Sequence, residues 1–344
     1  MHVDARRIWL ATRWRLVALA IAVALAACST PRAATDGTAP PTTPAGEATP
    51  AASGTATPPA SPQPGTTASA TASATTTPPG QPVVLVGAGD IASCGSSGDE
   101  ATADLLDGIA GTVFTAGDNA YDRGTAAEFA DCYGPTWGRQ RDRTLPVPGN
   151  HDYATAGAAG YFGYFGAAAG EPAEGWYAID LGAWRIYALN SDCWAIGGCE
   201  AASAQERWLR EDLESNPRAC VLAIWHHPRF SSGEHGSDPM TSALWQALDD
   251  AGAEIIVNGH DHDYERFGPQ DVSGTADPGG IVEYVVGSGG RSHYAFGTPI
   301  ANSLVRDSTA FGVIRFDLDA GGWASTFVPV AGATFTDSAS GTCH

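Results

Sequence analysis

The chain contains no lysine, so all 18 of its basic residues are arginines. This absence excludes a P-loop nucleotide site, whose lysine contacts the phosphates, and any mechanism that forms a Schiff base on lysine. Basic residues are also outnumbered, because 38 aspartates and glutamates leave a formal net charge of −20 at pH 7. A charge of that sign argues against nucleic acid or an anionic membrane as a broad electrostatic partner.

An apolar run at residues 16–27 is too short, and too close to the N-terminus, for an ordinary membrane-spanning helix. It follows several arginines and therefore predicts a signal peptide. The run ends in Leu25-Ala26-Ala27-Cys28, which resembles a bacterial lipobox. We therefore expect residues 1–28 to be a signal peptide with a lipobox, and Cys28 to tether an exported protein to the cell surface through a lipid. A plain secretory signal is the alternative, and the choice between the Sec and Tat routes stays open.

Large apolar side chains are almost missing from residues 29–81, which are rich in proline, threonine, alanine, serine and glycine. Such a segment cannot offset its ordering entropy by burying apolar surface, so we expect a disordered stalk. Residues 82–344 have a normal size for one α/β catalytic domain.

The cysteine spacings match no zinc-thiolate pattern. With Cys28 lipidated, six cysteines remain, and an even number in an exported protein favours disulfides over metal thiolates. Cys193 and Cys199 flank a short loop that contains glycine, so we expect them to pair. Two further pairs are then implied: Cys94–Cys132 and Cys220–Cys343.

Short apolar runs and capping residues predict the order of strands and helices. Early βαβ units are followed by strands, which favours an α/β fold of two packed β-sheets with helices outside. Residues 153–175 show little periodicity and are interpreted as a long functional loop. Strands are expected at residues 83–86, 112–115, 145–147, 177–181, 185–190, 221–225, 254–257, 282–286, 311–316 and 323–328. Helices are expected at residues 99–109, 125–132, 203–215 and 242–250.

Five polar motifs follow short apolar runs, at the positions where strands are expected to end. Carboxylate, phenol, amide and imidazole groups in one site suit Fe, Zn or Mn and do not suit calcium, which prefers oxygen ligands. Residues i and i+2 of an extended segment face the same way, so His260 and His262 can reach one site while Asp261 points elsewhere. The motifs are Gly89-Asp90, Gly117-Asp118-Asn119-Ala120-Tyr121, Gly149-Asn150-His151-Asp152, His226-His227-Pro228 and Gly259-His260-Asp261-His262.

In this order, the motifs resemble those of the calcineurin-like metallophosphoesterases, over roughly residues 83–330. Tyr121 and the continuation Tyr264-Glu265-Arg266 resemble the motifs of the purple acid phosphatase branch. That branch usually has glycine two residues after the position of Asp90, where this chain has Ala92. The resemblance implies an αββα sandwich of mixed sheets with the metal site at the C-terminal ends of the strands. It also implies two ligand sets that share Asp118: Asp90, Asp118, Tyr121 and His262 for one metal, and Asp118, Asn150, His226 and His260 for the other.

Two metals in such a site clamp the attacking and leaving oxygens of an in-line displacement, and a metal-bound hydroxide serves as the nucleophile. We therefore expect a phosphoric ester hydrolase, most simply an acid phosphatase-like phosphomonoesterase that acts on a small phosphorylated substrate. A phosphodiesterase with the same metals is the alternative. The resemblance implies iron together with Zn, Mn or a second Fe.

Three other residues are candidates for catalysis. The family uses the histidine at the position of His151 against the phosphate or the leaving oxygen, and Asp152 is expected to orient it. His235 lies in the loop after His226, where purple acid phosphatases keep an acid histidine, although a plain exposed histidine is an equal alternative. By the same resemblance His226 is the ligand, and His227 is expected to support it.

Two remote alternatives come from other classes of protein. Residues 87–92 match the dinucleotide fingerprint G-x-G-x-x-[G/A], but an NAD site needs a helix to begin at once, and a loop-like sequence follows. A non-catalytic metal-binding lipoprotein would not need His151, which this chain has.

Overall fold

The computed structural model describes residues 82–344. The predicted signal peptide, Cys28 and the predicted stalk lie outside these residues. Within the part that is described, no helix has the length and apolar character needed to cross a membrane.

One sheet has six strands in the order β13-β12-β11-β1-β2-β3. Strands β1, β2 and β3 run parallel to one another, and α1 (Gly98–Gly108) connects β1 to β2. On the other side, β11 pairs with β1 in the antiparallel sense. The strands are β1 (Val83–Ala88), β2 (Thr112–Thr115), β3 (Thr144–Leu145), β11 (Gly312–Leu318), β12 (Gly322–Pro329) and β13 (Ser338–Thr342).

The other sheet has seven strands in the order β10-β8-β9-β7-β6-β5-β4. Its centre is parallel, and the helices α5 (Ala204–Ser215) and α6 (Ser242–Asp250) connect β5 to β6 and β6 to β7. The predicted hairpin is present as the antiparallel pair β4 and β5. The strands are β4 (Tyr177–Leu181), β5 (Trp184–Ala188), β6 (Cys220–Ile224), β7 (Ile255–Asn258), β8 (Tyr264–Phe267), β9 (Val282–Val286) and β10 (Ser303–Asp307).

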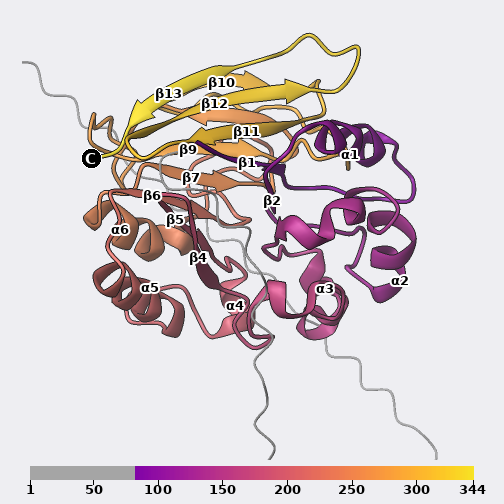
Figure 1. The fold of residues 1–344 in the computed structure, drawn as a ribbon, viewed down its shortest axis with the longest axis horizontal. Coiled ribbons are helices and arrows are strands. Elements are labelled where there is room, and N and C mark those ends of the chain that lie inside the picture. Colours follow the sequence, from indigo (N-terminus) through magenta and orange to yellow (C-terminus); the bar gives the residue numbers. More distant parts are fainter. Residues whose placement is uncertain (1–81) are drawn as a thin grey trace, which may run out of the picture. The chain divides into compact units, whose positions relative to one another are not determined.

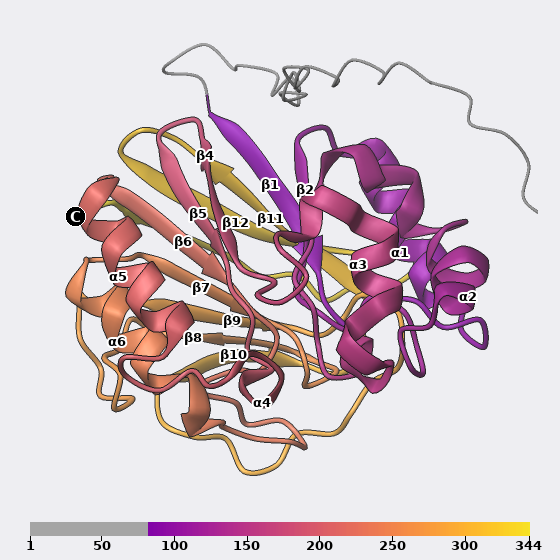
Figure 2. The same cartoon turned by 90° about the horizontal axis from the view of Figure 1, so that it is seen from below.

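The two sheets pack against each other, as predicted (Figures 1 and 2). The period of two along a strand decides which side chain enters which layer. In β6, Leu222 and Ile224 belong to the core between the sheets. Val221 and Ala223 face the other way and pack with Leu209 of α5 and with apolar residues of α6. Helices α1, α2 (Ala126–Glu128) and α3 (Ala159–Phe165) lie together beside β1 and β2, and α5 and α6 lie along the second sheet (Figure 2).

Helix boundaries follow local capping chemistry. The Ser203 side chain accepts a hydrogen bond from the Glu206 amide at the start of α5, as the capping-box pattern predicts. The return half of the box is shifted, because Glu206 accepts from the amide of Ala202 instead. Outside residues 152–169, the other helical segments are α2 (Ala126–Glu128), η1 (Phe129–Tyr133), η2 (Trp137–Arg143), α4 (Cys193–Ile196) and η6 (Pro239–Thr241).

The prediction of one long loop at residues 153–175 is wrong. This region contains α3 (Ala159–Phe165) and the short helices η3 (Asp152–Ala154), η4 (Ala156–Ala158) and η5 (Gly166–Ala169). Tyr161, Phe162 and Phe165 are buried in the main core, so packing of aromatic rings stabilises a helix that has a weak sequence signal.

The three predicted disulfides are confirmed: Cys94–Cys132, Cys193–Cys199 and Cys220–Cys343. The structure also excludes the dinucleotide site, as the loop-like sequence after residue 92 indicates. After β1 the chain forms a loop, and α1 begins only at Gly98, so no helix N-terminus follows the glycines directly.

Candidate metal centre

The predicted metal-binding side chains all lie on loops that directly follow strands. Because β1 to β3 are parallel, and β6 and β7 are parallel, the following loops meet at one edge of each sheet. Packing of the two sheets brings these edges together. The first sheet contributes Asp90, Asp118, Tyr121 and Asn150, and the second contributes His226, His260 and His262.

The hydroxyl of Tyr121 is the centre of a first group of donor atoms. It lies 2.9 Å from Asp90 Oδ1, 2.8 Å from Asp118 Oδ2 and 3.1 Å from His262 Nε2. His262 Nε2 is also 3.2 Å from Asp90 Oδ1. All four side chains are buried.

His226 Nε2 is the centre of a second group. It lies 3.1 Å from Asn150 Oδ1, 3.3 Å from His260 Nδ1 and 3.4 Å from Asp118 Oδ2. The same oxygen of Asp118 therefore contacts both groups, which is the position of a bridging atom.

The donor atoms have the spacing that metal ions require. Oxygen and nitrogen ligands roughly 2.0–2.2 Å from a metal stand about 3 Å from one another. The separations within both groups, from 2.8 to 3.4 Å, agree with such coordination shells. The residues present therefore fit two metal ions, one in each group.

Backbone contacts orient the acceptor atoms toward the centre. Asp90 uses its other oxygen, Oδ2, to accept from the amide of His260 at 2.8 Å, and Asp118 Oδ1 accepts from the amide of His151 at 2.8 Å. Nδ1 of His226 lies 2.8 Å from the carbonyl oxygen of Ala116. A carbonyl can only accept, so Nδ1 carries a proton, and Nε2 is the nitrogen that can offer a lone pair to a metal once the ring is neutral.

The backbone at the centre is strained and tightly packed. Asp90, Asp118 and His260 have φ angles of 60°, 50° and 72°, in the left-handed region that non-glycine residues rarely adopt. A Cβ atom on Gly149 would lie 2.3 Å from Asp118 Oδ1, and one on Gly117 would lie 2.5 Å from the His226 ring. Both motif glycines are therefore required by close approach of the loops.

The electrostatics of the centre call for positive charge. Burial opposes ionisation of Asp118, but the neighbouring His226 and His151 hold its pKa well below the usual range. Burial also disfavours a charged His226, yet Asp118 and Asp90 outweigh that effect and raise the pKa of His226 to about 10. The pKa of Tyr121 is raised well above 10 by burial and by the same two carboxylates. A proton on His226 thus supplies positive charge beside the two carboxylates, where a metal cation would otherwise supply it.

His151 lies at the rim of the centre. Its ring packs on Tyr121 with centroids 4.4 Å apart, its side chain is 37% exposed, and Nε2 is 3.9 Å from Asp118 Oδ2. The expectation that Asp152 orients this ring is wrong, because Nδ1 of His151 contacts the carbonyl oxygen of Asp122 at 2.6 Å. Asp152 is fully buried and instead accepts from Asn119 and from the amide of Gly149, so it ties two of the metal-binding loops together.

His235 also reaches the centre. Its ring stacks on the ring of His260 with centroids 4.3 Å apart, although the residue itself is exposed. Asp261 points away from the metals and accepts from the amide of His235 at 2.7 Å, so it fixes the loop that carries His235. Alternation at residues 260–262 therefore serves two functions, since the histidines face the centre and the carboxylate anchors a rim loop.

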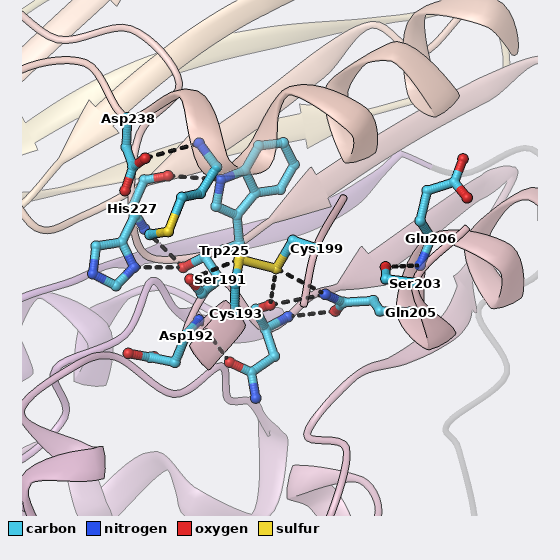
Figure 3. Close-up of a disulfide and its surroundings, with 12 residues drawn as sticks. Ser191, Asp192, Cys193, Cys199, Ser203, Gln205, Glu206, Trp225, His227 and Asp238 are labelled. Carbon is cyan, nitrogen blue, oxygen red and sulfur yellow. Dashed lines mark hydrogen bonds between the residues drawn. A yellow bond between two sulfur atoms is a disulfide. The ribbon is translucent and has the colours of Figure 1, made fainter. Parts of the chain in front are cut away.

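Next to the centre, His227 lies where the sequence interpretation expected a residue that supports His226, and it contacts a residue that this interpretation missed, Ser191. His227 packs against His226 and His260, with ring centroids 4.9 and 4.4 Å away, and these three imidazoles form a cluster that could hold a metal. Ser191, on the loop before the Cys193–Cys199 disulfide, contacts His227 through its hydroxyl (Figure 3). No motif marks Ser191, since only the contact between β5 and β6 brings it to His227.

The sandwich fold and this dense group of donor atoms define an α/β scaffold that could hold metal ions. A family model for calcineurin-like phosphoesterases matches residues 74–264, more than half of the chain, so the protein belongs to this family.

Similar proteins place it among relatives of the purple acid phosphatases. Purple acid phosphatase 18 of Arabidopsis thaliana is 30% identical over 123 residues, which cover 34% of this chain and 25% of the relative. Purple acid phosphatase 15 of the same plant is 33% identical over 98 residues, or 27% of this chain and 18% of the relative. The matched region thus spans only about a quarter or less of these relatives.

Two solved structures share the fold. Purple acid phosphatase PPD1 from yellow lupin (Lupinus luteus) seeds aligns with a TM-score of 0.61 and 19% identity over 76% of this chain and 54% of that chain. GAP50, described as the anchor in the inner membrane complex of Plasmodium, aligns with a TM-score of 0.58 and 14% identity over 75% of this chain and 88% of that chain. The same fold is thus found in a phosphatase and in an anchoring protein, so function must be argued from the site.

Proposed function

We propose that the protein hydrolyses phosphoric monoesters with two metal ions. The observation that carries this proposal is the convergence of the donor atoms into two groups that share one oxygen of Asp118. The first metal would be held by Asp90, Asp118, Tyr121 and His262, and the second by Asp118, Asn150, His226 and His260.

When bound, the two ions would supply a nucleophilic water at neutral pH and neutralise charge on the phosphoryl group. The side chains of the protein would position the two metals and would donate hydrogen bonds or protons to the substrate. Asp118 holds the two groups together, and its second oxygen is fixed by a backbone amide. His151 and His235 approach from different loops and are exposed enough to meet a substrate.

His151 would stabilise the phosphoryl charge or protonate the leaving oxygen. Its Nδ1 contacts a carbonyl and therefore carries a proton, so Nε2 is a donor only when the ring is the imidazolium form. His235 would assist from the side of His260. A monoester carries more charge than a diester, which favours a site with two such histidines at its rim.

The donor set supports a proposal for the metals. The first group contains a phenol and two carboxylates, which are hard donors and suit iron, while the second has imidazoles and an amide and suits Zn, Mn or a second Fe. The names of the Arabidopsis relatives agree with an acid phosphatase-like activity.

Metal analysis of the purified protein, with rates on p-nitrophenyl phosphate and bis-p-nitrophenyl phosphate, tests the proposal. Two metals per chain and faster hydrolysis of the monoester are expected. Faster hydrolysis of the diester would replace the monoesterase with the phosphodiesterase alternative. Two bound metals without hydrolysis of either ester would instead favour a non-catalytic protein.

For localisation, we propose export and tethering through a lipid on Cys28, with no stable nucleic-acid partner. The three disulfides support an oxidising compartment. Replacing Cys28 with alanine in the full chain should move the protein from the membrane fraction to the soluble fraction. An unchanged soluble distribution of the wild type and the variant would favour a plain secretory signal.

A further inference from the structure

We propose that His227 is a neutral hydrogen-bond donor for the phosphoryl group of the substrate, and that Ser191 fixes the ring tautomer needed for this. This inference rests on the proposed function, because it assumes that a phosphate binds beside His226 and His260. It concerns a residue that the predicted ligand sets leave out.

The hydrogen bonds of Ser191 determine which nitrogen of His227 carries the proton. The Ser191 hydroxyl accepts from the backbone amide of His227 at 2.9 Å, and the same oxygen lies 2.8 Å from His227 Nδ1 (Figure 3). Ser191 is fully buried, and its hydroxyl has no other acceptor among residues 82–344. A buried hydroxyl proton left unpaired costs about 1–3 kcal/mol, so this proton is donated to Nδ1. Nε2 must then carry the ring proton of the neutral imidazole.

The two adjacent histidines therefore have opposite tautomers. Nδ1 of His226 faces a carbonyl and keeps its proton, so in the neutral ring that binds a metal the lone pair is on Nε2, the atom that contacts the other donor groups. Nδ1 of His227 faces a hydroxyl that has to donate, which leaves an N–H on Nε2. The first tautomer suits a metal ligand and the second suits contact with an anion. His262 also contacts a serine, but Ser292 is half-buried, so its hydroxyl proton can go to solvent and does not fix that ring.

The position of the ring fits this function. His227 packs on the rings of His226 and His260, within the cluster of the second group, and it is 9% exposed. Within the described part of the chain Nε2 has no hydrogen-bond partner, and it points away from Ser191 in Figure 3. Phosphate oxygens bound by the metal in that group would thus meet a donor that is already oriented.

The segment that carries Ser191 is held by contacts on both sides of this residue. Asn190, just before it, donates to the hydroxyl of Tyr153 and its amide donates to Gln205. Just after it, the Cys193–Cys199 disulfide closes a short loop. A fixed Ser191 keeps the tautomer of His227 without any charged partner, so Ser191 acts as a positioning residue.

Three variants of the full protein, loaded with metal, test the proposal: His227→Phe, His227→Gln and Ser191→Ala. The phenyl ring keeps the packing but removes the donor, while the glutamine amide retains an N–H at a similar reach. Metal content is measured for each variant, and binding of inorganic phosphate is measured by calorimetry. The free energy of a hydrogen bond to a charged group corresponds to about a 10- to 100-fold change in Kd.

We expect all three variants to keep two metals. His227→Phe should weaken phosphate binding about 10- to 100-fold, His227→Gln should stay within a few-fold of the wild type, and Ser191→Ala should lie between them. Loss of a metal from His227→Phe would make His227 a metal ligand and overturn the proposal. Equal phosphate affinity in the wild type and His227→Phe would overturn it as well.

Two further outcomes of this experiment are decided separately. If His227→Phe does not fold, Ser191→Ala decides, because it leaves both imidazoles in place, and an unchanged phosphate Kd in that variant would refute the proposal. If the metal-loaded wild type itself binds no phosphate, the proposed function fails first. The two failures are therefore distinguishable.

Discussion

Substitution of Tyr121 by phenylalanine tests whether the phenol binds metal as an anion. In the metal-free protein the pKa of Tyr121 lies well above 10, because burial and the charges of Asp118 and Asp90 oppose ionisation. The side chain is therefore a neutral phenol at pH 7. Binding as a phenolate requires it to release one proton, which Tyr121→Phe cannot do.

The energetics permit this step. A phenol with a pKa more than three units above the solution pH costs more than about 4 kcal/mol to ionise. Binding of a structural zinc ion supplies about 10–16 kcal/mol at pH 7. His226, with a pKa of about 10, is also protonated at pH 7 and must lose its proton to offer Nε2 to a metal. The wild type should thus release protons from both residues, and Tyr121→Phe should release one fewer.

Calorimetric titration of the metal-free protein with Zn²⁺ at pH 7, in two buffers of different ionisation enthalpy, counts these protons. Tyr133→Phe is a matched control, because Tyr133 is fully buried and its hydroxyl has no hydrogen-bond partner within residues 82–344. The control should release as many protons as the wild type. Equal counts for Tyr121→Phe and the wild type would refute Tyr121 as an anionic ligand. Loading with oxidised iron gives a second readout, since the wild type should absorb visible light and Tyr121→Phe should be bleached.

Four further outcomes are expected. Asp118→Asn should lower the metal content below two per chain and remove most activity, whereas Asp131→Asn, at an exposed position, should change neither; near-normal turnover with two metals would contradict the bridging position. Gly149→Ala should reduce both metal content and stability, the latter by about 1–3 kcal/mol, because its Cβ would overlap Asp118; a thermal melt and metal content equal to those of the wild type would refute this. His151→Ala should slow alkyl phosphates by about 10²- to 10⁴-fold, and p-nitrophenyl phosphate far less, while both metals stay bound; equal losses on the two substrates would make His151 a positioning group instead of an acid. Thiol titration of the denatured, unreduced residues 82–344 should find no free thiol, and two or more reactive thiols would contradict the disulfides.

Much of the fold was predictable from the sequence because its signals are local. Buried strands such as β9 (Val282–Val286) are continuous apolar runs, and α6 has the period and length of an amphipathic helix. The predicted bounds of both elements agree with the structure. Edge and neighbouring strands were missed, including β8, β10 and β13, because their residues are mixed in polarity and become strands only by pairing with a partner. Tertiary contacts also hold β8 in place, since the side chains of Tyr264 and Arg266 both bind Asp337.

The sequence by itself determined which residue types are available for metal binding and in what order they occur, since each motif is a short turn that follows its own strand. Only the tertiary structure decided how they combine. Each donor group takes residues from both sheets, with His262 joining Asp90 in the first and His226 joining Asn150 in the second. Such groups form only when the two sheets pack, a contact between residues far apart in the chain.

Packing also decided the contacts of residues that lie just outside the predicted metal ligands. Asp152 follows His151 directly in the sequence, yet it binds Asn119, because burial places its carboxylate against backbone amides of two loops. Ser191 has no sequence signal and sets the tautomer of His227 through one hydroxyl. Local sequence specifies turns and apolar periods, whereas the protonated nitrogen of each histidine depends on the atom that the folded chain brings to its other side.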